Sequence, residues 1–393
     1  MNGAGPASGI AVYAELLPNI QQVSIAATLS SHSDDSTSAE VTDGGCCIRI
    51  RHRDRAQAVE LPAAAAASAA LALPSIPCSN LAWRLPVAAL HPRSLPLAPE
   101  NQEIPWASAD LKMGSAVSCR QCGNDLVWRD QVNIWKDLPS ENWAEMMEFW
   151  HCHKPHDDGN SNHGALADRA YGANSAIAAR PGVGFVDVTS FMFFESDCHD
   201  LLFSSSPSST TFKSSALAID QAPPRRHGHV FCGGCRTQVG LFSPSSPSVT
   251  LFKWQVTCET VSADRAPGIV ECLAAALLAA ISRSACAKSV VVPYVSGSTT
   301  KAMHLWVLNA NLVYTSSARQ GKRAALKMLY REIGLDEAHG LVDSATSDVE
   351  EISLPMRTIK AVRRALEAST ALMPERERSF KGWSAGLLER WTT

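Results

Sequence analysis

Short runs with a two-residue period dominate the first hundred residues of the chain. Cys47 to His52 and Leu81 to Pro86 alternate apolar with polar side chains, and two earlier runs, Ile10 to Leu17 and Gln22 to Leu29, are short and β-prone. Alternation of this kind places one face of a strand against a core and the other in water. The pattern predicts several antiparallel strands in a β-rich N-terminal domain.

Low-complexity pieces interrupt these strands and then end the domain. A Ser/Asp-rich piece at 30–38 indicates a loop, and an alanine-rich piece at 63–72 indicates either a short helix or an unstructured spacer. Prolines are frequent from Pro92 to Pro105, which is typical of a linker. We therefore place the β-rich domain, with its low-complexity insertions, at residues 1–105.

The C-terminal region, residues 261–393, begins with a mixture of helical and strand patterns. An apolar run at 269–281 predicts a helix, and runs at 289–294 and 304–309 predict strands. Apolar side chains then recur at helical spacing, which predicts a further helix from about Ser317 to a stop at Gly334. The apolar face of that helix is formed by Leu326, Leu329, Tyr330 and Ile333.

The chain ends with one more helix and an aromatic tail. The helix is predicted from about Pro355 to Pro374, because Ile359, Val362 and Leu366 fall on one side of it. The tail FKGWSAGLLERW is expected to dock on a core. Residues 261–393 are thus predicted to form an α/β C-terminal region, and the fold class of the whole chain is predicted as α+β.

An amphipathic helix is predicted from Leu138 to Pro155, in the middle of the chain. Ser140 is suited to cap its start, and Pro155 ends it because proline disfavours helical geometry in the preceding residue. Four large side chains share one face: Trp143, Met146, Met147 and Trp150. Met-rich and aromatic faces pack into cores and also fill the grooves of partner proteins. The sequence leaves both interpretations open.

Cys152 lies near the end of this helix, between the imidazoles of His151 and His153. A thiol in this position can be an activated nucleophile, a metal ligand or a half-buried, non-catalytic side chain. The residue pattern alone does not decide among these roles.

Two CxxC pairs flank the helix, Cys119 with Cys122 and Cys232 with Cys235. Glycine follows the second cysteine of CRQCG and lies inside CGGC, which suits the tight turns of metal-binding knuckles. Four thiolates are the ligands of a tetrahedral structural zinc, so one Zn²⁺ held by both pairs is the predicted cofactor of a central region at 106–260. The alternatives are two unrelated pairs, disulfides or a redox site at CGGC. A redox site requires a helix beginning at Cys232, whereas the flanking residues predict two strands around a turn.

Composition narrows the classes of function. The net charge is −3 and no basic run dominates any region, so no direct nucleic-acid partner is expected. The most apolar window, 269–281, is too short to span a membrane. No N-terminal stretch has the pattern of a secretory signal, so a reducing compartment is expected. No phosphate-binding glycine loop, Ser/His/Asp set or paired-carboxylate motif indicates another enzyme class.

Several motifs together resemble the HECT-like family of ubiquitin-conjugating-enzyme-binding proteins, which are assigned as E3 ubiquitin-protein ligases. They are LPSENWAEMMEFWHCHKP after a CxxC pair, the CGGC knuckle, WVLN within 304–309 and the ending FKGWSAGLLERW. The resemblance covers residues 105–393 by motif and the N-terminal part loosely. It implies binding of a ubiquitin-conjugating enzyme (E2), ubiquitin transfer that can modify the ligase itself, cyclin-type substrates, and a cytosolic and nuclear location. Family members are also linked to the endonuclease that cleaves pre-mRNA 3′ ends.

The resemblance also implies roles for the central helix. Cys152 stands at the motif cysteine associated with E2 engagement, and the face that carries Trp143 and Trp150 is the implied E2-binding surface. True HECT ligases carry a thioester cysteine near the C-terminus in a Thr-Cys context. Here Cys286 is the last cysteine, 107 residues before the end, and Cys258 follows Thr257 in a strand-like run instead. The thioester chemistry of a HECT lobe is therefore not expected at either residue.

Three mechanisms remain open. In the first, Cys152 is a nucleophile that accepts ubiquitin from the E2. In the second, the protein positions a charged E2 without covalent chemistry, and proximity supplies the rate. In the third, the protein is not an enzyme but a zinc-stapled scaffold or chaperone for a nuclear partner such as the mRNA 3′-end-processing endonuclease.

Overall fold

The computed structural model describes residues 9–66, 70–88, 103–138, 178–205, 211–215, 228–243, 246–261, 265–294, 301–344 and 348–392. The chain divides into two compact units. Unit 1 comprises residues 1–103 and 269–392, and unit 2 comprises residues 104–268. The described residues are mostly β-sheet with three α-helices, which agrees with the predicted α+β class. None of these helices is long and apolar enough to cross a membrane.

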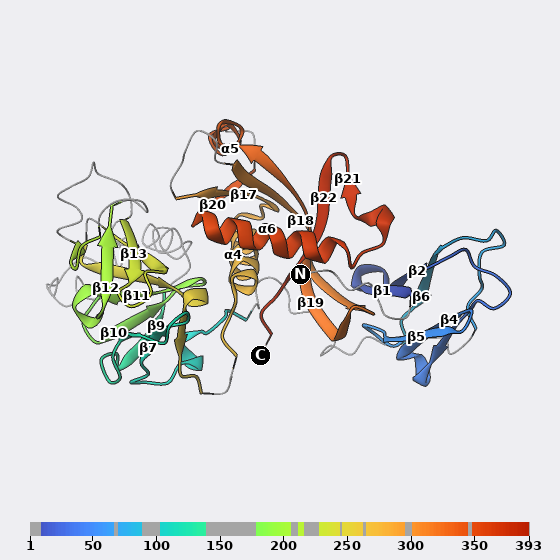
Figure 1. Cartoon of the computed structure of the whole chain (residues 1–393), viewed down its shortest axis with the longest axis horizontal. Coiled ribbons are helices and arrows are strands. Elements are labelled where there is room, and N and C mark those ends of the chain that lie inside the picture. The colour runs from blue at the N-terminus through green and yellow to red at the C-terminus, as the bar shows by residue number, and fades with distance from the viewer. Residues whose placement is uncertain are drawn as a thin grey trace, which may run out of the picture. The chain divides into compact units, whose positions relative to one another are not determined.

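Unit 1 is built on a nine-stranded sheet to which both halves of the unit contribute (Figure 1). Its main path runs β21 (Ser379–Phe380), β22 (Trp383–Glu389), β19 (Arg319–Gly334), β18 (Lys301–Ser316), β1 (Ile10–Leu17), β2 (Gln22–Leu29) and β6 (Asn80–Pro86). Beside this path, β17 (Lys288–Pro293) pairs with β18 and, in parallel, with β20 (Glu350–Leu354). These bounds confirm the predicted strands at 10–17, 22–29, 81–86, 289–294 and 304–309.

The antiparallel pairing of β1 with β18 joins the two halves of unit 1. In the register of this pair, Tyr13 lies opposite Ser316 and Glu15 opposite Tyr314. The N-terminal and C-terminal regions, expected at 1–105 and 261–393, thus contribute strands to the same sheet and share one core.

Residues 319–334 form strand β19, so the prediction of a helix from Ser317 to Gly334 was wrong. Leu326, Met328 and Leu329 are all buried, although neighbours along a strand point to opposite faces. A strand buried on both faces is a near-continuous apolar run, which satisfies helical spacing as well as alternation. Gly334 ends this strand and precedes the short helix α5 (Leu335–Val342).

Two longer helices, α4 (Ile269–Ser284) and α6 (Met356–Thr370), contact each other and strand β22 (Figure 1). Both helices were predicted, and Ile359, Val362 and Leu366 form the buried face of α6 as expected. Helix α5 packs against β17, β18 and β19, where Val290, Ala302, Ile333 and Ala338 form a small apolar cluster.

A buried ion-pair network ties β1 to β19 inside unit 1. The Nζ atom of Lys327 lies 3.0 Å from a carboxylate oxygen of Glu15 and 2.8 Å from one of Glu377. The Tyr13 hydroxyl donates to the same Glu15 carboxylate at 2.9 Å. Burial and this carboxylate raise the pKa of Tyr13 well above its ordinary value, so the phenol remains a hydrogen-bond donor at physiological pH.

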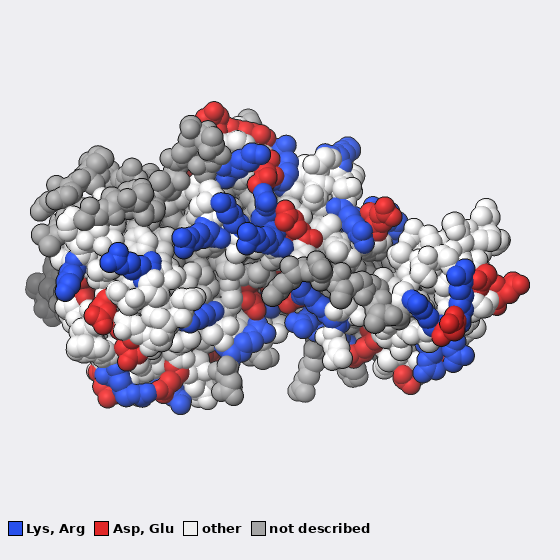
Figure 2. Space-filling view, in the orientation of Figure 1, with Lys and Arg blue, Asp and Glu red and all other residues white. Residues whose placement is uncertain are grey.

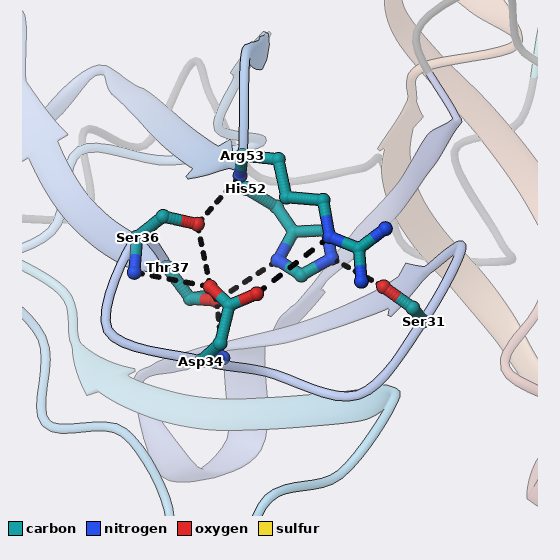
Figure 3. Close-up of polar contacts among 6 residues, drawn as sticks. All are labelled: Ser31, Asp34, Ser36, Thr37, His52 and Arg53. Carbon is teal, nitrogen blue, oxygen red and sulfur yellow. Dashed lines mark hydrogen bonds and ion pairs between the residues drawn. The ribbon is translucent and has the colours of Figure 1, made fainter.

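A separate three-stranded sheet in unit 1 consists of β3 (Ser38–Thr42), β4 (Cys47–His52) and β5 (Arg55–Glu60), and β4 confirms the predicted strand at 47–52. The described parts of the alanine-rich piece, 63–66 and 70–72, contain isolated β-bridges and no helix. A polar network at one end of this sheet fixes the preceding loop (Figure 3). Its members are Ser31, Asp34, Ser36, Thr37, His52 and Arg53.

The buried imidazole of His52 is the centre of that network. Its Nε2 atom lies 2.8 Å from the Ser31 hydroxyl and its Nδ1 atom 2.9 Å from the Thr37 hydroxyl. Asp34 accepts hydrogen bonds from Thr37 and Ser36, so a hydroxyl stands between the carboxylate and the imidazole (Figure 3). The arrangement therefore differs from a Ser-His-Asp set, in which the carboxylate contacts the imidazole directly.

Unit 2 contains a seven-stranded and a three-stranded sheet. The larger has the order β12 (Leu201–Ser204), β13 (Gly228–Cys232), β14 (Gln238–Phe242), β15 (Ser248–Phe252), β11 (Ser190–Phe194), β10 (Val183–Val186) and β9 (Ile134–Asp137). The smaller has the order β16 (Val256–Cys258), β7 (Val117–Cys119) and β8 (Asp125–Val127). The largest buried side chains of unit 2 include Phe191, Phe193 and Trp106. Strands β7 and β13 each end at a cysteine, which prepares the site described next.

Candidate metal centre

The two predicted cysteine pairs of unit 2 converge at one point. The four Sγ atoms of Cys119, Cys122, Cys232 and Cys235 all lie within 4.8 Å of one another. The Sγ atom of Cys119 lies 3.7 Å from that of Cys235, and the Sγ atom of Cys122 lies 3.6 Å from that of Cys232. Four sulfurs placed tetrahedrally around a metal at a Zn–S distance of about 2.3 Å are separated by about 3.8 Å. The donor set therefore fits a single tetrahedral metal ion, and its separations are too long for disulfide bonds of about 2.05 Å.

The first knuckle connects β7 to β8. Gly123 has a φ of 74°, a conformation that glycine adopts without steric cost. This turn lets the Gly123 amide donate to the Cys119 carbonyl at 2.8 Å, while the Cys119 amide donates to the Asn124 carbonyl at 2.7 Å. The CRQCG sequence thus folds back within five residues and brings both sulfurs to the same side.

The second knuckle repeats this geometry between β13 and β14. The Arg236 amide donates to the Cys232 carbonyl at 2.8 Å, and the Cys232 amide donates to the Thr237 carbonyl at 2.9 Å. Arg236 has a φ of 58°, so it occupies the position that Gly123 takes in the first knuckle. Arg236 was not identifiable by residue type, because a non-glycine residue does not signal this conformation, although its place directly after a CxxC pair is an indication of it.

The strand before Cys232 argues against a redox interpretation of CGGC. That interpretation required a helix beginning at Cys232, but Cys232 ends β13 and the pair forms the turn that leads to β14. The prediction of two strands around a turn is confirmed. All four cysteines are free thiols, which also argues against the disulfide alternative.

The four sulfurs lie in unequal environments. Cys119 and Cys232 are buried and Cys122 is exposed. Burial raises the pKa of the Cys119 thiol to about 12, and burial also raises that of Cys232. Hydrogen bonds from the side chain of Thr237 lower the pKa of Cys235 to about 6. A bound dication would supply the positive charge that allows the buried pair to ionise as well.

Arg120, inside the first knuckle, connects the site to the chain that follows the seven-stranded sheet. Its guanidinium donates to the carbonyls of Lys253 at 2.9 Å, Val256 at 2.8 Å and Pro267 at 2.9 Å. Asn124 adds a long contact of 3.9 Å from its amide to the Cys232 sulfur. These supporting contacts were not foreseen, because they depend on long-range folding rather than local spacing.

The nearby histidines are not part of the sulfur cluster. The ring of His199 stacks on Trp128 with centroids 3.4 Å apart, and His229 is buried beside the Gln238 side chain at 3.0 Å. His227 lies outside the described residues. The donor set within the described chain therefore consists of thiols alone.

Cys258 and Cys286 lie outside the sulfur cluster, and each packs within the protein. Cys258 ends β16, and burial raises the pKa of its thiol to about 12, so it is protonated at neutral pH. Cys286 is buried and its thiol donates to the carbonyl of Asp348 at 2.6 Å. The raised pKa of Cys258 makes its thiol a poor nucleophile at neutral pH.

The predicted helix at 138–155 lies outside the described residues apart from Leu138. This includes the proposed E2-binding and catalytic side chains Trp143, Met146, Met147, Trp150 and Cys152. Along the chain, this segment follows β9 and precedes β10. These strands pair in parallel, and the Leu138 amide donates to the Val186 carbonyl at 2.7 Å. The segment is thus an insertion between two adjacent strands of unit 2.

Comparison with known proteins gives one family. Residues 15–385 match the family described as HECT-like ubiquitin-conjugating enzyme (E2)-binding. The uncharacterized protein YJR141W of Saccharomyces cerevisiae is 21% identical over 283 residues, which cover 71% of each chain. The uncharacterized protein C1734.10c of Schizosaccharomyces pombe is 42% identical over 55 residues, covering 13% of this chain and 16% of that protein. No solved structure matches.

Proposed function

Because the chain belongs to the HECT-like ubiquitin-conjugating enzyme (E2)-binding family, we propose that it binds an E2 and acts as an E3 ubiquitin-protein ligase. Its product would be ubiquitin attached to protein lysines, including its own. The observation that carries the proposal is the extent of the family match, which includes both cysteine pairs and the central WAEMMEFWHC motif. The cytosol and nucleus are the proposed location.

One Zn²⁺ has a structural role in this proposal. Four thiolates favour zinc over harder cations such as Mg²⁺ or Ca²⁺, which prefer oxygen ligands. The ion would join two knuckles separated by 109 residues of sequence, between Cys122 and Cys232. The insertion with the E2-binding motif lies within these residues, so metal binding would hold together the two ends of the segment that contains the motif.

The central motif provides the proposed E2 contacts. Trp143, Met146, Met147 and Trp150 would fill an apolar groove of the E2 as one face of a helix. In the covalent form of the mechanism, the Cys152 thiolate attacks the thioester carbonyl of the charged E2. The E2 thiolate leaves, and a lysine amine then takes ubiquitin from Cys152. In the non-covalent form, the lysine attacks the E2 thioester directly and the ligase only orients the reactants.

Discharge of a ubiquitin-charged E2, resolved on a non-reducing gel, tests the proposal. Wild type is expected to discharge at least one member of an E2 panel. A reducible ubiquitin adduct that disappears in Cys152→Ser would establish the covalent form, and discharge that is unchanged in this variant would establish the positioning form. Cys258→Ser is the matched control and is expected to behave as wild type.

Absence of both binding and discharge across the panel would contradict the proposal. The protein would then fit a zinc-stapled scaffold or chaperone for a nuclear partner. Trp143→Ala with Trp150→Ala provides a second measurement, because loss of E2 binding in this double variant is expected under either form of ligase mechanism.

A further inference from the structure

A groove of about 520 Å³ lies in unit 1 between the start of β18 and the first half of α6. Its apolar lining is formed by Ala302, Met303, Met356 and Ile359. Its charged lining comprises four cations and one anion, namely Lys301, Lys360, Arg363, Arg364 and Glu332. The groove thus combines an aliphatic floor with a strongly positive rim.

Three of the rim cations are available to a ligand. Arg363 is engaged, because its guanidinium lies 2.5 Å from Glu332 and 3.2 Å from Glu367. Lys301, Lys360 and Arg364 are exposed and make no ion pair within the described part of the chain. Figure 2 shows Lys and Arg side chains gathered where α6 runs in Figure 1. Since the net charge of the whole chain is −3, this positive surface is a local feature.

The beginning of α6 adds to the positive potential. The helix starts at Met356, and its first turn contains no acidic side chain. The first N–H groups of a helix carry a partial positive charge, which an Asp or Glu usually offsets at this position. A ligand carboxylate at the Met356 end of the groove would provide the same compensation.

We propose that this groove binds an acidic segment of a partner protein, an extended peptide with several Asp or Glu residues around one aliphatic or aromatic anchor. The anchor would lie on Met356, the partly exposed member of the apolar lining, because Ala302, Met303 and Ile359 are buried beneath it. The carboxylates would pair with Lys301, Lys360 and Arg364. The described residues of the lining include no aromatic ring, whereas single-stranded nucleic-acid sites stack bases on aromatic side chains. A small inorganic anion would leave the partly exposed Met356 side chain uncovered. The inference goes beyond the ligase proposal and does not depend on it.

Binding of a synthetic peptide to the full-length protein tests the inference. The probe is a fluorescein-labelled twelve-residue peptide in which Asp and Glu surround a single leucine, measured by fluorescence anisotropy. We expect a dissociation constant on the order of 10 µM, typical of a small interface, and binding several-fold weaker when NaCl rises from about 50 to 200 mM. The same peptide with Asn and Gln in place of the acids is expected to bind at least tenfold more weakly.

Exposed side chains of the rim allow variants that leave the fold intact. Lys360→Glu combined with Arg364→Glu is expected to weaken peptide binding at least tenfold. The double variant Arg51→Glu with Arg84→Glu makes the same change in net charge at exposed positions on β4 and β6, outside the groove, and is expected to bind as wild type. Met356→Ala is expected to weaken binding of the leucine peptide, but not of a peptide with alanine as its anchor.

Equal binding of the acidic peptide by wild type and the Lys360/Arg364 variant, with unchanged circular dichroism, would overturn the inference. Equal binding of the acidic and the neutral peptide would also overturn it. An unlabelled single-stranded oligonucleotide or inorganic phosphate that competes better than the peptide, at equal charge, would assign the groove to another class of ligand. The readout needs no E2 or ubiquitin, so failure of the ligase proposal leaves the result unaffected.

Discussion

The two buried cysteines of the metal centre, Cys119 and Cys232, give the sharpest prediction for a single side chain. Replacing Cys232 with serine removes one of four thiolates and leaves a polar atom in a buried site. We expect zinc to fall from about one equivalent per chain to a small fraction, and unit 2 to lose several kcal/mol of stability, because metal binding and folding are coupled. Metal content by elemental mass spectrometry and thermal unfolding with and without chelator provide the measurement.

Cys258→Ser is the control for this experiment, since Cys258 is a half-buried cysteine of the neighbouring strand β16 that lies outside the sulfur cluster. It is expected to keep the metal. Full zinc content and unchanged unfolding in Cys232→Ser would rule out the metal centre as assigned.

His304 in β18 is the second residue with a measurable consequence. Its ring is buried against Trp383 at a centroid distance of 4.7 Å, and its Nε2 atom has no hydrogen-bond partner within the described residues. Burial, then the positive charges of Arg331 and Lys288, lower the pKa of His304 to about 4. The folded state therefore prefers the neutral imidazole, whereas the unfolded chain binds a proton near pH 6.5.

This difference predicts that unit 1 loses stability as the pH falls. The contribution of neutral His304 is complete above about pH 6.5 and declines by about 2 kcal/mol by pH 5. His304→Phe keeps an aromatic ring but does not titrate, so the decline should shrink in this variant. Hydrogen exchange of peptides from β18 and β19 at pH 7 and pH 5, corrected for intrinsic rates, is the measurement. The exposed His32 serves as control, because His32→Gln should retain the full decline. Equal declines in wild type and His304→Phe would refute the assignment.

At the residue scale, the sequence predicted what local spacing determines. The CxxC pairs are a local code, so the four thiols were identified before their convergence was known. His304 could not be identified in this way. Its environment depends on Arg331 and Trp383, which come from other strands. The protonation state of a thiol such as Cys258 can likewise be inferred only when its burial is known.

At the scale of elements, the contact between α6 and β22 makes a testable prediction. Leu366 is fully buried, and a Cβ atom added to Gly386 would lie 3.0 Å from its Cδ2 atom and 3.1 Å from a Tyr330 ring carbon. Leu366→Ala should cost about 2–4 kcal/mol through lost burial and a cavity. Gly386→Ala should cost about 1–2 kcal/mol through overpacking.

The two changes should partly compensate, because removing the Leu366 side chain makes room for the new methyl group. We expect the double variant to be less destabilised than the sum of the single variants by about 1 kcal/mol. Chemical unfolding of all four proteins completes the cycle. Strict additivity would show that α6 does not pack on β22 through this pair.

The same scale explains which elements were predictable. Helix α6 is amphipathic and half-exposed, so its period was visible in Ile359, Val362 and Leu366. Strand β19 is covered on both faces, so its apolar residues form a nearly continuous run, broken by Lys327, from which helical spacing can be selected. Burial on both sides removes the polar positions that distinguish the two periods. The error at 317–334 therefore follows from the tertiary structure around that strand.

At the scale of the whole molecule, sequence composition and strand pairing give different information. Prolines near residue 100 indicated a boundary there, and the structure begins unit 2 at Ile104. Composition contains no signal that β1 pairs with β18, because this pairing joins positions about three hundred residues apart. The grouping of residues 1–103 with 269–392 was accessible only from the three-dimensional structure.

That grouping predicts how fragments of the chain behave. Residues 104–268 contain both sheets of unit 2 and all four cysteines, so this fragment should fold alone with zinc and unfold cooperatively.

Residues 269–392 lack β1, β2 and β6, which leaves the β18 edge without its partner and Lys327 without Glu15. Lys327 keeps Glu377 as a partner in this fragment, so the main loss is the strand pairing and apolar burial that β1 provides along β18. This fragment should therefore be unfolded or aggregated by itself and should be rescued when residues 1–103 are co-expressed as a separate chain. Co-purification and a cooperative thermal transition by circular dichroism are the measurements. Cooperative unfolding of residues 269–392 alone would show instead that the C-terminal region is an independent domain.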